Sequence, residues 1–545
     1  MKSIFGNKSG LKAIYIRRIE KLYNRQIPPQ FIITPELALD ICKISQQISR
    51  QIALLINRKG KIAYVIVGDS QRIVIPDTGK YRAAHGHLRG LRCVHTHLKA
   101  NEPLSSDDLT DLALLRLDMM VAITLSDNRH THQVYIGYIL SDSISSGKPY
   151  HILSPISLDE LDTGCLDQIR VFENKLSHVS TSSSVEDGKE RALLVSVSLK
   201  SKQYAYDSLK ELKELAVTCG LNVAGFFMQQ RKKVDSRFMM GMGKLQDMVI
   251  EAYSKGAEII IFEQELNTSQ IRSITDLTEL KVIDRTQLIL DIFAQRAMSR
   301  EGKLQVELAQ LQYLLPRLIV KNTALSRLTG GIGGRGPGET KLEINRRRVR
   351  DRITRLKKEL SLVKKQRILQ KAKRNKKGLP IISIIGYTNA GKSTLLNTLT
   401  KSNVCAKNQL FATLDPSNRR LKFPKDVEVI ITDTVGFIKD LPKALLIAFS
   451  ATLEELESAD LLLHVIDISN PDYENQAKSV EKILRDLDLH NIPVIRIFNK
   501  QDLLKDKAID KISDFFDGIF ISACDQSTFK PLIDEILKFI KNMKY

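Results

Sequence analysis

The chain has 545 residues, of which 43% are hydrophobic and 27% charged, and its formal net charge at pH 7 is +21. The length predicts about three or four domains, and the composition is that of a soluble globular protein. The six cysteines form no C-x-x-C pair, no apolar run reaches about 18 residues, and the N-terminus lacks a signal-peptide core. These features exclude a disulfide-stapled secreted protein and a helical membrane protein, and they predict a cytoplasmic protein without membrane insertion.

The positive charge is concentrated in one segment. Between Lys341 and Lys377 there are 17 basic residues and three acidic ones, so this segment carries +14 of the total. Such a concentration is typical of a polyanion-binding surface, and the alternative is a solvated helix face.

Residues 1–188 are predicted to form an α+β extension. Apolar runs at 62–68 and 71–76 indicate a hairpin of two strands, and residues 119–125 indicate a third strand. Residues 178–188 are rich in Ser and Thr, which predicts a linker to the next domain.

This extension holds a candidate metal motif. His95 and His97 occupy alternate positions, and Ser105 and Asp108 follow at a fixed interval. The order H-x-H, seven residues, S-x-x-D resembles the zinc motif of JAMM/RadC-type domains. The resemblance implies that His95, His97 and Asp108 would bind zinc and leave a position open for water.

Two residues depart from that motif. Leu98 stands where the JAMM/RadC family has proline, and Gln51 is the nearest candidate for the family's upstream glutamate. The motif is therefore interpreted in three ways: a working zinc site, a metal-free relative of the fold, or a chance pair of histidines on a strand.

Residues 189–290 are predicted to form a small parallel α/β domain, because strand and helix patterns alternate there. Strands are expected at 192–199, 222–228, 258–262 and 281–283, and helices at 208–218, 243–254 and 268–278.

Residues 291–378 are predicted to form a basic antiparallel helical hairpin. Leucines repeat at spacings of four and three from Leu304 to Leu318, and a second apolar seam runs from Leu342 to Val363. Pro316 is expected to shorten or kink the first helix. Between the helices, residues 330–339 form a glycine-rich tip, which suits close approach to a partner or is simply a flexible loop. Its G-x-G-x-x-G pattern follows a helix instead of a strand, so a dinucleotide site is rejected.

Residues 379–545 carry a phosphate-binding loop. A buried strand at 381–385 leads into G-x-x-x-x-G-K-S and then into a helix, the setting in which backbone N–H groups point at phosphate oxygens. Lys392 is expected to contact the β- and γ-phosphates, and Ser393 to ligate Mg²⁺. The residues predicted to contact nucleotide here are Gly386, Tyr387, Thr388, Asn389, Ala390, Gly391, Lys392, Ser393 and Thr394.

A D-x-x-G element follows the strand predicted at 427–432. It consists of Asp433, Thr434, Val435 and Gly436. Asp433 is expected to hold Mg²⁺ through water, and the Gly436 N–H to meet the γ-phosphate. Upstream, Phe411 and Thr413 lie in the switch I interval. Thr413 is the predicted hydroxyl ligand of Mg²⁺, with Thr434 as its competitor.

The guanine reader is N-K-x-D, formed by Asn499, Lys500 and Asp502 after a strand at 493–498. The Asp502 carboxylate would accept from guanine N1–H and N2–H₂, which adenine lacks, so this pocket should reject ATP. Ser522 and Ala523 are expected to close the base pocket. Lys392, Thr413 and Gly436 are the predicted catalytic residues of a GTPase.

Phe437 follows the D-x-x-G glycine, where Ras-type enzymes place a water-orienting glutamine. Intrinsic hydrolysis is therefore expected to be slow and to need a partner or an ion. Asn389 occupies the loop position that binds K⁺ in cation-activated relatives, so stimulation by K⁺ is a further hypothesis.

From about residue 190 onward the chain resembles the HflX family of GTPases. The motifs that carry this are residues 284–293, 302–311, 330–339, 346–348 and 433–437. The resemblance covers about two thirds of the chain. It implies GTP hydrolysis, ATP-capable binding attributed to the N-terminal α/β domain, association with the large ribosomal subunit and its RNA, and splitting of stalled ribosomes. Many members lack the first 188 residues, and a further C-terminal domain of some members is not expected here.

The leading hypothesis is a monomeric GTP-switched factor that binds the large ribosomal subunit. One alternative is a ribosome-assembly or RNA-maturation GTPase with the same elements. Another is a metalloenzyme with a regulatory GTPase domain, which requires zinc at the His95 motif.

Overall fold

The computed structural model describes most of the chain. The described residues are 3–78, 81, 87–125, 132–139, 150–158, 161, 164–184, 189–319, 341–375, 379–400, 411, 417–423, 427–434, 436–439, 456–504 and 517–543. They form two compact units. One comprises Met1–Leu199, Asn222–Ile260 and Ser273–Val282, and the other comprises Lys200–Leu221, Ile261–Arg272 and Ile283–Tyr545.

The N-terminal region is built on one mixed sheet with the order β1-β3-β2-β4-β5-β6-β7, and β8 also pairs with β6. Its strands are β1 (Phe5–Gly6), β2 (Ile52–Asn57), β3 (Ile62–Val67), β4 (Leu91–His97), β5 (Met119–Thr124), β6 (Gln133–Ile139), β7 (Tyr150–Ile152) and β8 (Ile156–Ser157). Its helices are α1 (Ala13–Lys21), α2 (Pro35–Ile48), α3 (Ser106–Leu114) and α4 (Cys165–Ser184).

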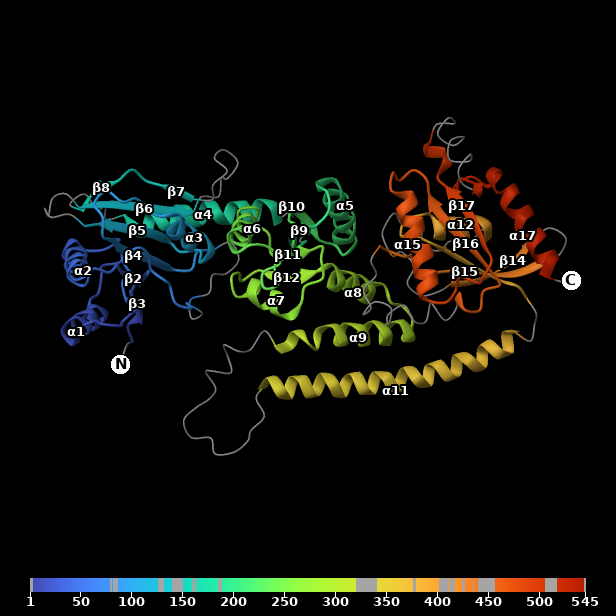
Figure 1. Ribbon diagram of the computed structural model, residues 1–545, viewed down its shortest axis with the longest axis horizontal. Coiled ribbons are helices and arrows are strands. Elements are labelled where there is room, and N and C mark those ends of the chain that lie inside the picture. The colour runs from blue at the N-terminus through green and yellow to red at the C-terminus, as the bar shows by residue number, and fades with distance from the viewer. Residues whose placement is uncertain are drawn as a thin grey trace. The chain divides into compact units, whose positions relative to one another are not determined.

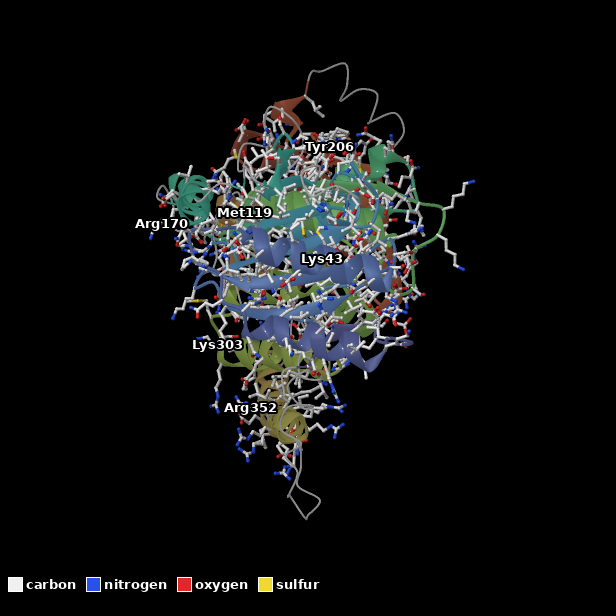
Figure 2. The ribbon with its side chains drawn as sticks, turned by 90° about the vertical axis from the view of Figure 1, so that its left-hand side faces the viewer. Lys43, Met119, Arg170, Tyr206, Lys303 and Arg352 are labelled. Atoms are coloured by element: carbon white, nitrogen blue, oxygen red, sulfur yellow. The ribbon has the colours of Figure 1, made fainter. Side chains whose placement is uncertain are left out.

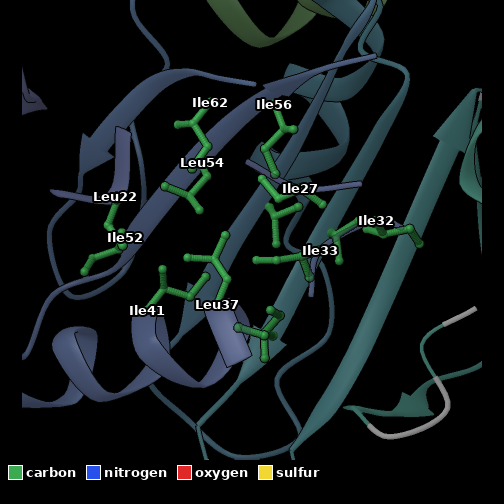
Figure 3. Packing of buried hydrophobic residues seen from close by; sticks show 14 of the residues in the cluster. Leu22, Ile27, Ile32, Ile33, Leu37, Ile41, Ile52, Leu54, Ile56 and Ile62 are labelled. Atoms are coloured by element: carbon green, nitrogen blue, oxygen red, sulfur yellow. The ribbon is translucent and has the colours of Figure 1, made fainter. Parts of the chain in front are cut away.

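Both faces of this sheet are buried. One face packs on α2 through a cluster that includes Leu37, Ile41, Leu54 and Val94 (Figure 3). The other face packs on α3 through a cluster that includes Leu55, Cys93, Leu109 and Leu112. Every residue of β5 is consequently buried, as expected for a strand covered on both sides.

The hairpin predicted from residues 62–68 and 71–76 is wrong. The hairpin partner of β3 is β2, with which it pairs antiparallel, and residues 71–76 form no strand although they are described. The Asp69 side chain accepts the backbone N–H groups of Gln71 and Arg72, each at 2.8 Å, and so turns the chain after β3. These hydrogen bonds satisfy two backbone donors at the start of the segment without a partner strand.

The linker predicted at residues 178–188 is also wrong over most of its length, because α4 continues to Ser184. The start of α4 is anchored on the sheet by buried Cys165 and Ile169. Once a helix is nucleated, each added residue gains one hydrogen bond at little cost, which carries α4 through the Ser- and Thr-rich stretch. Residues 185–188 lie outside the described residues.

The middle region is the predicted α/β fold. Its sheet has the order β10-β9-β11-β12, and β9 and β10 are parallel. The elements are β9 (Arg191–Ser198), α5 (Lys202–Thr218), β10 (Asn222–Gln230), α6 (Met242–Ser254), β11 (Ile259–Phe262), α7 (Thr268–Thr275), β12 (Lys281–Asp284) and α8 (Arg285–Arg296).

The helical hairpin consists of α9 (Arg300–Leu314) and α11 (Lys341–Asn375), which lie side by side (Figure 1). Leu304 and Leu308 of α9 pack against Ile353 and Leu356 of α11. The helix α9 ends two residues before Pro316, as expected from the missing backbone N–H of proline. In Figure 2 the labelled Arg352 marks α11, from which many basic side chains project. The glycine-rich tip at 330–339 lies outside the described residues.

The C-terminal domain is a doubly wound α/β fold. Its sheet has the order β14-β15-β13-β16-β17-β18, and β14 is antiparallel to β15, whereas the neighbours from β15 to β18 pair in parallel. The strands are β13 (Ile381–Gly386), β14 (Ser417–Phe423), β15 (Val427–Asp433), β16 (Leu461–Asp467), β17 (Val494–Asn499) and β18 (Ile519–Phe520). The helices include α12 (Lys392–Thr400), α15 (Tyr473–Asp486) and α17 (Lys530–Met543).

Within the described ranges, no helix has the length and apolar character needed to span a lipid bilayer.

Candidate nucleotide-binding site

The phosphate-binding loop connects the end of β13 to the start of α12. Gly386 and Gly391 have φ angles of 152° and 94°, and Asn389 lies in the left-handed region at 62°. A Cβ at Gly391 would lie 2.2 Å from Nδ2 of Asn499. The loop therefore requires glycine at position 391, both for its backbone conformation and for the close approach of β17.

Lys392 and Ser393 open α12 and face the end of β15. Lys392 is buried, and its Nζ donates to the Tyr387 carbonyl at 2.6 Å. Burial lowers the pKa of Lys392 to about 8, although the Asp433 carboxylate opposes this shift. The Ser393 hydroxyl donates to Oδ2 of Asp433 at 2.7 Å. A lysine ammonium, a hydroxyl and a carboxylate therefore meet at the carboxyl ends of two adjacent parallel strands.

The D-x-x-G segment pairs with the phosphate-binding loop. The Thr388 N–H donates to the Phe437 carbonyl at 2.8 Å, and the Phe437 N–H donates to the Gly386 carbonyl at 3.0 Å. A Cβ at Gly436 would lie 2.9 Å from Lys392 Nζ. The Phe437 side chain itself is only 3% exposed. The two loops thus form one backbone unit, and the residue after Gly436 contributes an apolar side chain to the interior.

Of the two candidate hydroxyl ligands for Mg²⁺, Thr434 is among the described residues and Thr413 is not. The Thr434 hydroxyl donates to the Ile384 carbonyl at 2.6 Å, and its side chain is fully buried. It is thus engaged by the backbone of β13. Thr413, like Val435, lies outside the described residues. Phe411 is described, and its buried ring packs edge-on against Phe293 at a centroid distance of 4.8 Å.

The predicted guanine reader lies at the end of β17. The Asn499 amide donates to the Ala390 carbonyl at 2.8 Å, and its oxygen accepts the Ala523 N–H at 2.8 Å. Lys500 has a φ of 65° and pairs with Asp467 at 2.7 Å. Asp502 follows on an exposed turn. Asn499 therefore links the phosphate-binding loop to Ala523, and Lys500 is held by Asp467, while Asp502 is exposed. Ser522 lies two residues after β18, and its backbone N–H donates to the Thr528 hydroxyl at 3.1 Å.

Sequence reasoning missed two residues that position this site. Asp467 ends β16 and accepts from the Ser469 hydroxyl as well as from Lys500. Its place at the carboxyl end of a buried parallel strand could have revealed it. Glu211 of α5 accepts the Tyr387 hydroxyl at 2.6 Å and pairs with Arg285 at 3.2 Å. No local pattern indicates that contact.

The histidine motif of the N-terminal region is brought together by the fold. His95, His97 and Asp108 offer three ligand atoms that all lie within 4.8 Å of one another, and all three residues are buried. Gln51 is buried as well and directly precedes β2.

Comparison with known proteins finds three family models that match consecutive segments between residues 206 and 500. Residues 206–294 match the family described as GTP-binding GTPase N-terminal, and residues 296–374 match the GTP-binding GTPase Middle Region. Residues 381–500 match the family described as 50S ribosome-binding GTPase.

Individual relatives span the same region. The GTPase HflX of Caldanaerobacter subterraneus is 50% identical over 317 residues, which are 58% of this chain and 74% of that protein. The GTPase HflX of Alkalihalophilus pseudofirmus is 46% identical over 355 residues, covering 65% of this chain and 84% of its own length. The GTPase HflX of Escherichia coli is 44% identical over 320 residues, or 59% of this chain and 75% of that protein.

Proposed function

Since this chain belongs to the HflX family of GTPases and hydrolyses GTP, we propose that it works on the large ribosomal subunit and splits stalled ribosomes. The observation that carries this proposal is the combination of a GTPase domain in the family described as ribosome-binding with a strongly basic helix in the same chain. A GTP-dependent switch would control docking, and hydrolysis would release the protein.

The residues of the phosphate end have complementary roles in this proposal. The N–H groups of the loop from Gly386 to Ser393 would bind the phosphates, and Lys392 would neutralise charge on the β- and γ-phosphates. Ser393 and Asp433 fit Mg²⁺, because it prefers oxygen ligands and their oxygens lie 2.7 Å apart. Thr413 is the proposed third ligand. Bound Mg²⁺ would offset the charge that develops on the transferring phosphate.

The base end supplies specificity in this proposal. Asp502 would accept from guanine N1–H and N2–H₂, and the Ser522–Ala523 segment would close over the base. The exposed position of Asp502 supports this role, because its carboxylate remains accessible to a base. Asn499 and Lys500 have a positioning role: Asn499 binds the Ala390 carbonyl, and Lys500 pairs with Asp467.

Slow intrinsic hydrolysis follows from Phe437. A buried apolar side chain cannot orient an attacking water, so the ribosome or an ion must supply that alignment. Asn389 is exposed and in the left-handed conformation, which leaves its side chain accessible to K⁺.

The basic helix α11 is the proposed contact with ribosomal RNA. Arg347, Arg348 and Arg350 are exposed along it. Phosphate contacts of this kind give binding that weakens steeply with salt, because each contact releases counterions.

The test is GTP turnover with and without purified large ribosomal subunits, in K⁺ and in Na⁺ buffers. We expect strong stimulation by the subunits and a higher rate in K⁺, followed by loss of 70S particles in gradient profiles when GTP is present. Unchanged turnover with the subunits would contradict the ribosomal part of the proposal, and equal rates in K⁺ and Na⁺ would contradict the K⁺ part.

A charge-reversal variant tests the RNA contact. Replacing Arg346, Arg347 and Arg348 with Glu should weaken subunit binding and flatten its salt dependence. The matched control reverses Lys478, Lys482 and Arg485, which are exposed on α15 and change the net charge equally. Equal loss in both variants would mean that only net charge matters and that α11 is not the contact.

A further inference from the structure

A compact group of two histidines and one aspartate lies buried in the N-terminal region, separate from the nucleotide residues. His95 and His97 are alternate residues of β4, so both side chains point to the face covered by α3. Asp108 lies in the first turn of α3. The exposed fractions of the three residues are 0%, 2% and 5%.

The ligand atoms of this group converge. The Nε2 atoms of His95 and His97 are 2.9 Å apart. One Asp108 oxygen lies 3.4 Å from His95 Nε2, and the other lies 3.4 Å from His97 Nε2. Atoms that each lie about 2.0–2.2 Å from one ion are separated by distances of about this size.

Neighbouring groups fix the orientation of His97. Its Nδ1 lies 3.1 Å from the carbonyl oxygen of Glu102, and a carbonyl can only accept a hydrogen bond. The proton of the neutral ring is therefore on Nδ1, and Nε2 presents a lone pair to the group. Metal-bound histidines are held in this way, with the second ring nitrogen donating to a fixed acceptor.

The Asp108 carboxylate is also held in place. Its Oδ2 accepts from the Ser105 N–H at 2.8 Å and from the Ser105 hydroxyl at 2.7 Å. The Ser105 oxygen in turn accepts the Asp108 N–H at 3.1 Å, which completes a capping box at the start of α3. The helix cap therefore sets the position from which the carboxylate faces the two imidazoles.

A lone pair of His97, the second imidazole and a carboxylate point at one buried spot. The ligand atoms of the three residues all lie within 4.8 Å of one another, close enough for one ion to bind all of them. We propose that His95, His97 and Asp108 bind one divalent transition-metal ion, with Zn²⁺ as the best fit to two imidazoles and one carboxylate.

The choice of ion follows from the ligand set. Mg²⁺ and Ca²⁺ prefer shells made of oxygen, whereas imidazole suits Zn²⁺ and its neighbours in the transition series. The ion ties β4, in the middle of the sheet, to the first turn of α3. Its binding is therefore coupled to the folding of this region, because the ligands come from two separate elements.

The first experiment measures metal in the purified full-length protein, followed by titration of chelator-treated protein with Zn²⁺ and with Co²⁺. We expect about one ion per chain and visible Co²⁺ absorption of a site with nitrogen and oxygen ligands. His97→Gln and Asp108→Asn should lower the affinity by at least about 100-fold. Ser105→Ala, which removes only the supporting hydroxyl, should lower it by roughly tenfold.

The matched control is His132→Gln. His132 is a buried histidine directly before β6, and its Nδ1 lies 2.8 Å from a carbonyl oxygen as in His97, but it is outside the metal-ligand group. It should bind the ion like the wild type. If a ligand variant fails to fold, the wild-type titration decides, with thermal unfolding expected to shift upward when Zn²⁺ is added back. Wild-type protein that takes up no ion, or equal uptake by wild type and Asp108→Asn, would overturn the proposal.

Discussion

The hydroxyl of Tyr387, in the phosphate-binding loop, donates a hydrogen bond of 2.6 Å to the carboxylate of Glu211 in α5. The same hydroxyl accepts the backbone N–H of Lys439 at 2.9 Å, next to the D-x-x-G segment. One side chain therefore joins α5, the phosphate-binding loop and the segment after Gly436. Burial and the nearby Glu211 carboxylate raise the pKa of Tyr387, so the hydroxyl keeps its proton as donor.

Removing that hydroxyl should loosen the segment after Gly436. In Tyr387→Phe, the Lys439 N–H loses its acceptor, and we expect a cost of about 1–3 kcal/mol for groups left without partners. Hydrogen exchange of the peptide that contains Lys439 should accelerate, as measured by mass spectrometry. Tyr206→Phe is the control, since Tyr206 is 43% exposed and lies outside this network. Equal exchange in both variants would show that the contact is unimportant.

The charge of Lys392 should make nucleotide affinity depend on pH. Burial lowers its pKa from 10.5 to about 8, so free protein loses this charge above pH 8. We expect GTP affinity to fall by roughly tenfold at pH 9 relative to pH 7, because the phosphates then meet a neutral amine. Lys392→Arg keeps its charge and should lack this decline. The same pH profile in both proteins would contradict the assignment.

The titration of Lys392 should also make the stability of the folded protein depend on pH. The folded pKa of Lys392 is lower than that of the unfolded chain, so the unfolded chain binds more protons between about pH 8 and pH 10. The free energy of unfolding of the nucleotide-free protein should therefore increase as the pH rises through this window, so the folded protein becomes more stable. Urea unfolding of wild type and Lys392→Met at pH 7 and pH 9 measures this change. The difference in unfolding free energy between the two proteins should be smaller at pH 9 than at pH 7.

Gly436→Ala should impair hydrolysis more than nucleotide binding. The added Cβ would lie 2.9 Å from Lys392 Nζ and from the backbone of Thr388, so one of them must move. Displacement of a catalytic group by about 1 Å costs about 100-fold in rate, which is the expected fall in GTP turnover. Gly243→Ala is the control, because its Cβ meets nothing within 4 Å. A turnover close to wild type in Gly436→Ala would contradict the close packing of these loops.

If Asp502 reads guanine as proposed, Asp502→Ala should weaken GTP binding by at least about 100-fold, because the variant would lack the charged acceptor for guanine N1–H and N2–H₂. The measurement is equilibrium binding of fluorescent GTP and GDP. Asp534→Ala removes an exposed carboxylate of α17 and should change nothing. If both variants bind GTP equally well, the guanine reader is elsewhere.

The conformation of the phosphate-binding loop could be predicted because it depends on local sequence. Gly386, Gly391 and Lys392 lie within seven residues, and the loop conformation follows from the need for glycine where the backbone adopts unusual φ angles. The strand and helix that flank the loop also have strong apolar patterns, so the expected and observed boundaries of β13 nearly coincide.

Contacts between distant segments could not be predicted in this way. Glu211 and Tyr387 are 176 residues apart, and nothing near either residue indicates the other. The wrong prediction of a strand at 71–76, in contrast, has a local cause. Its β-branched residues favour a strand, but the chain turns just before them, where the Asp69 carboxylate accepts the N–H groups of Gln71 and Arg72.

Asn499 connects both ends of the nucleotide site through one amide, from Ala390 in the phosphate loop to Ala523 beside the predicted base pocket. A rigid amide with a partner on each side fixes the span between those two loops. The distance between those two loops is therefore set inside the protein, and neither loop can shift without breaking a buried hydrogen bond. We expect this distance to select ligands by the separation of the two groups that the loops contact.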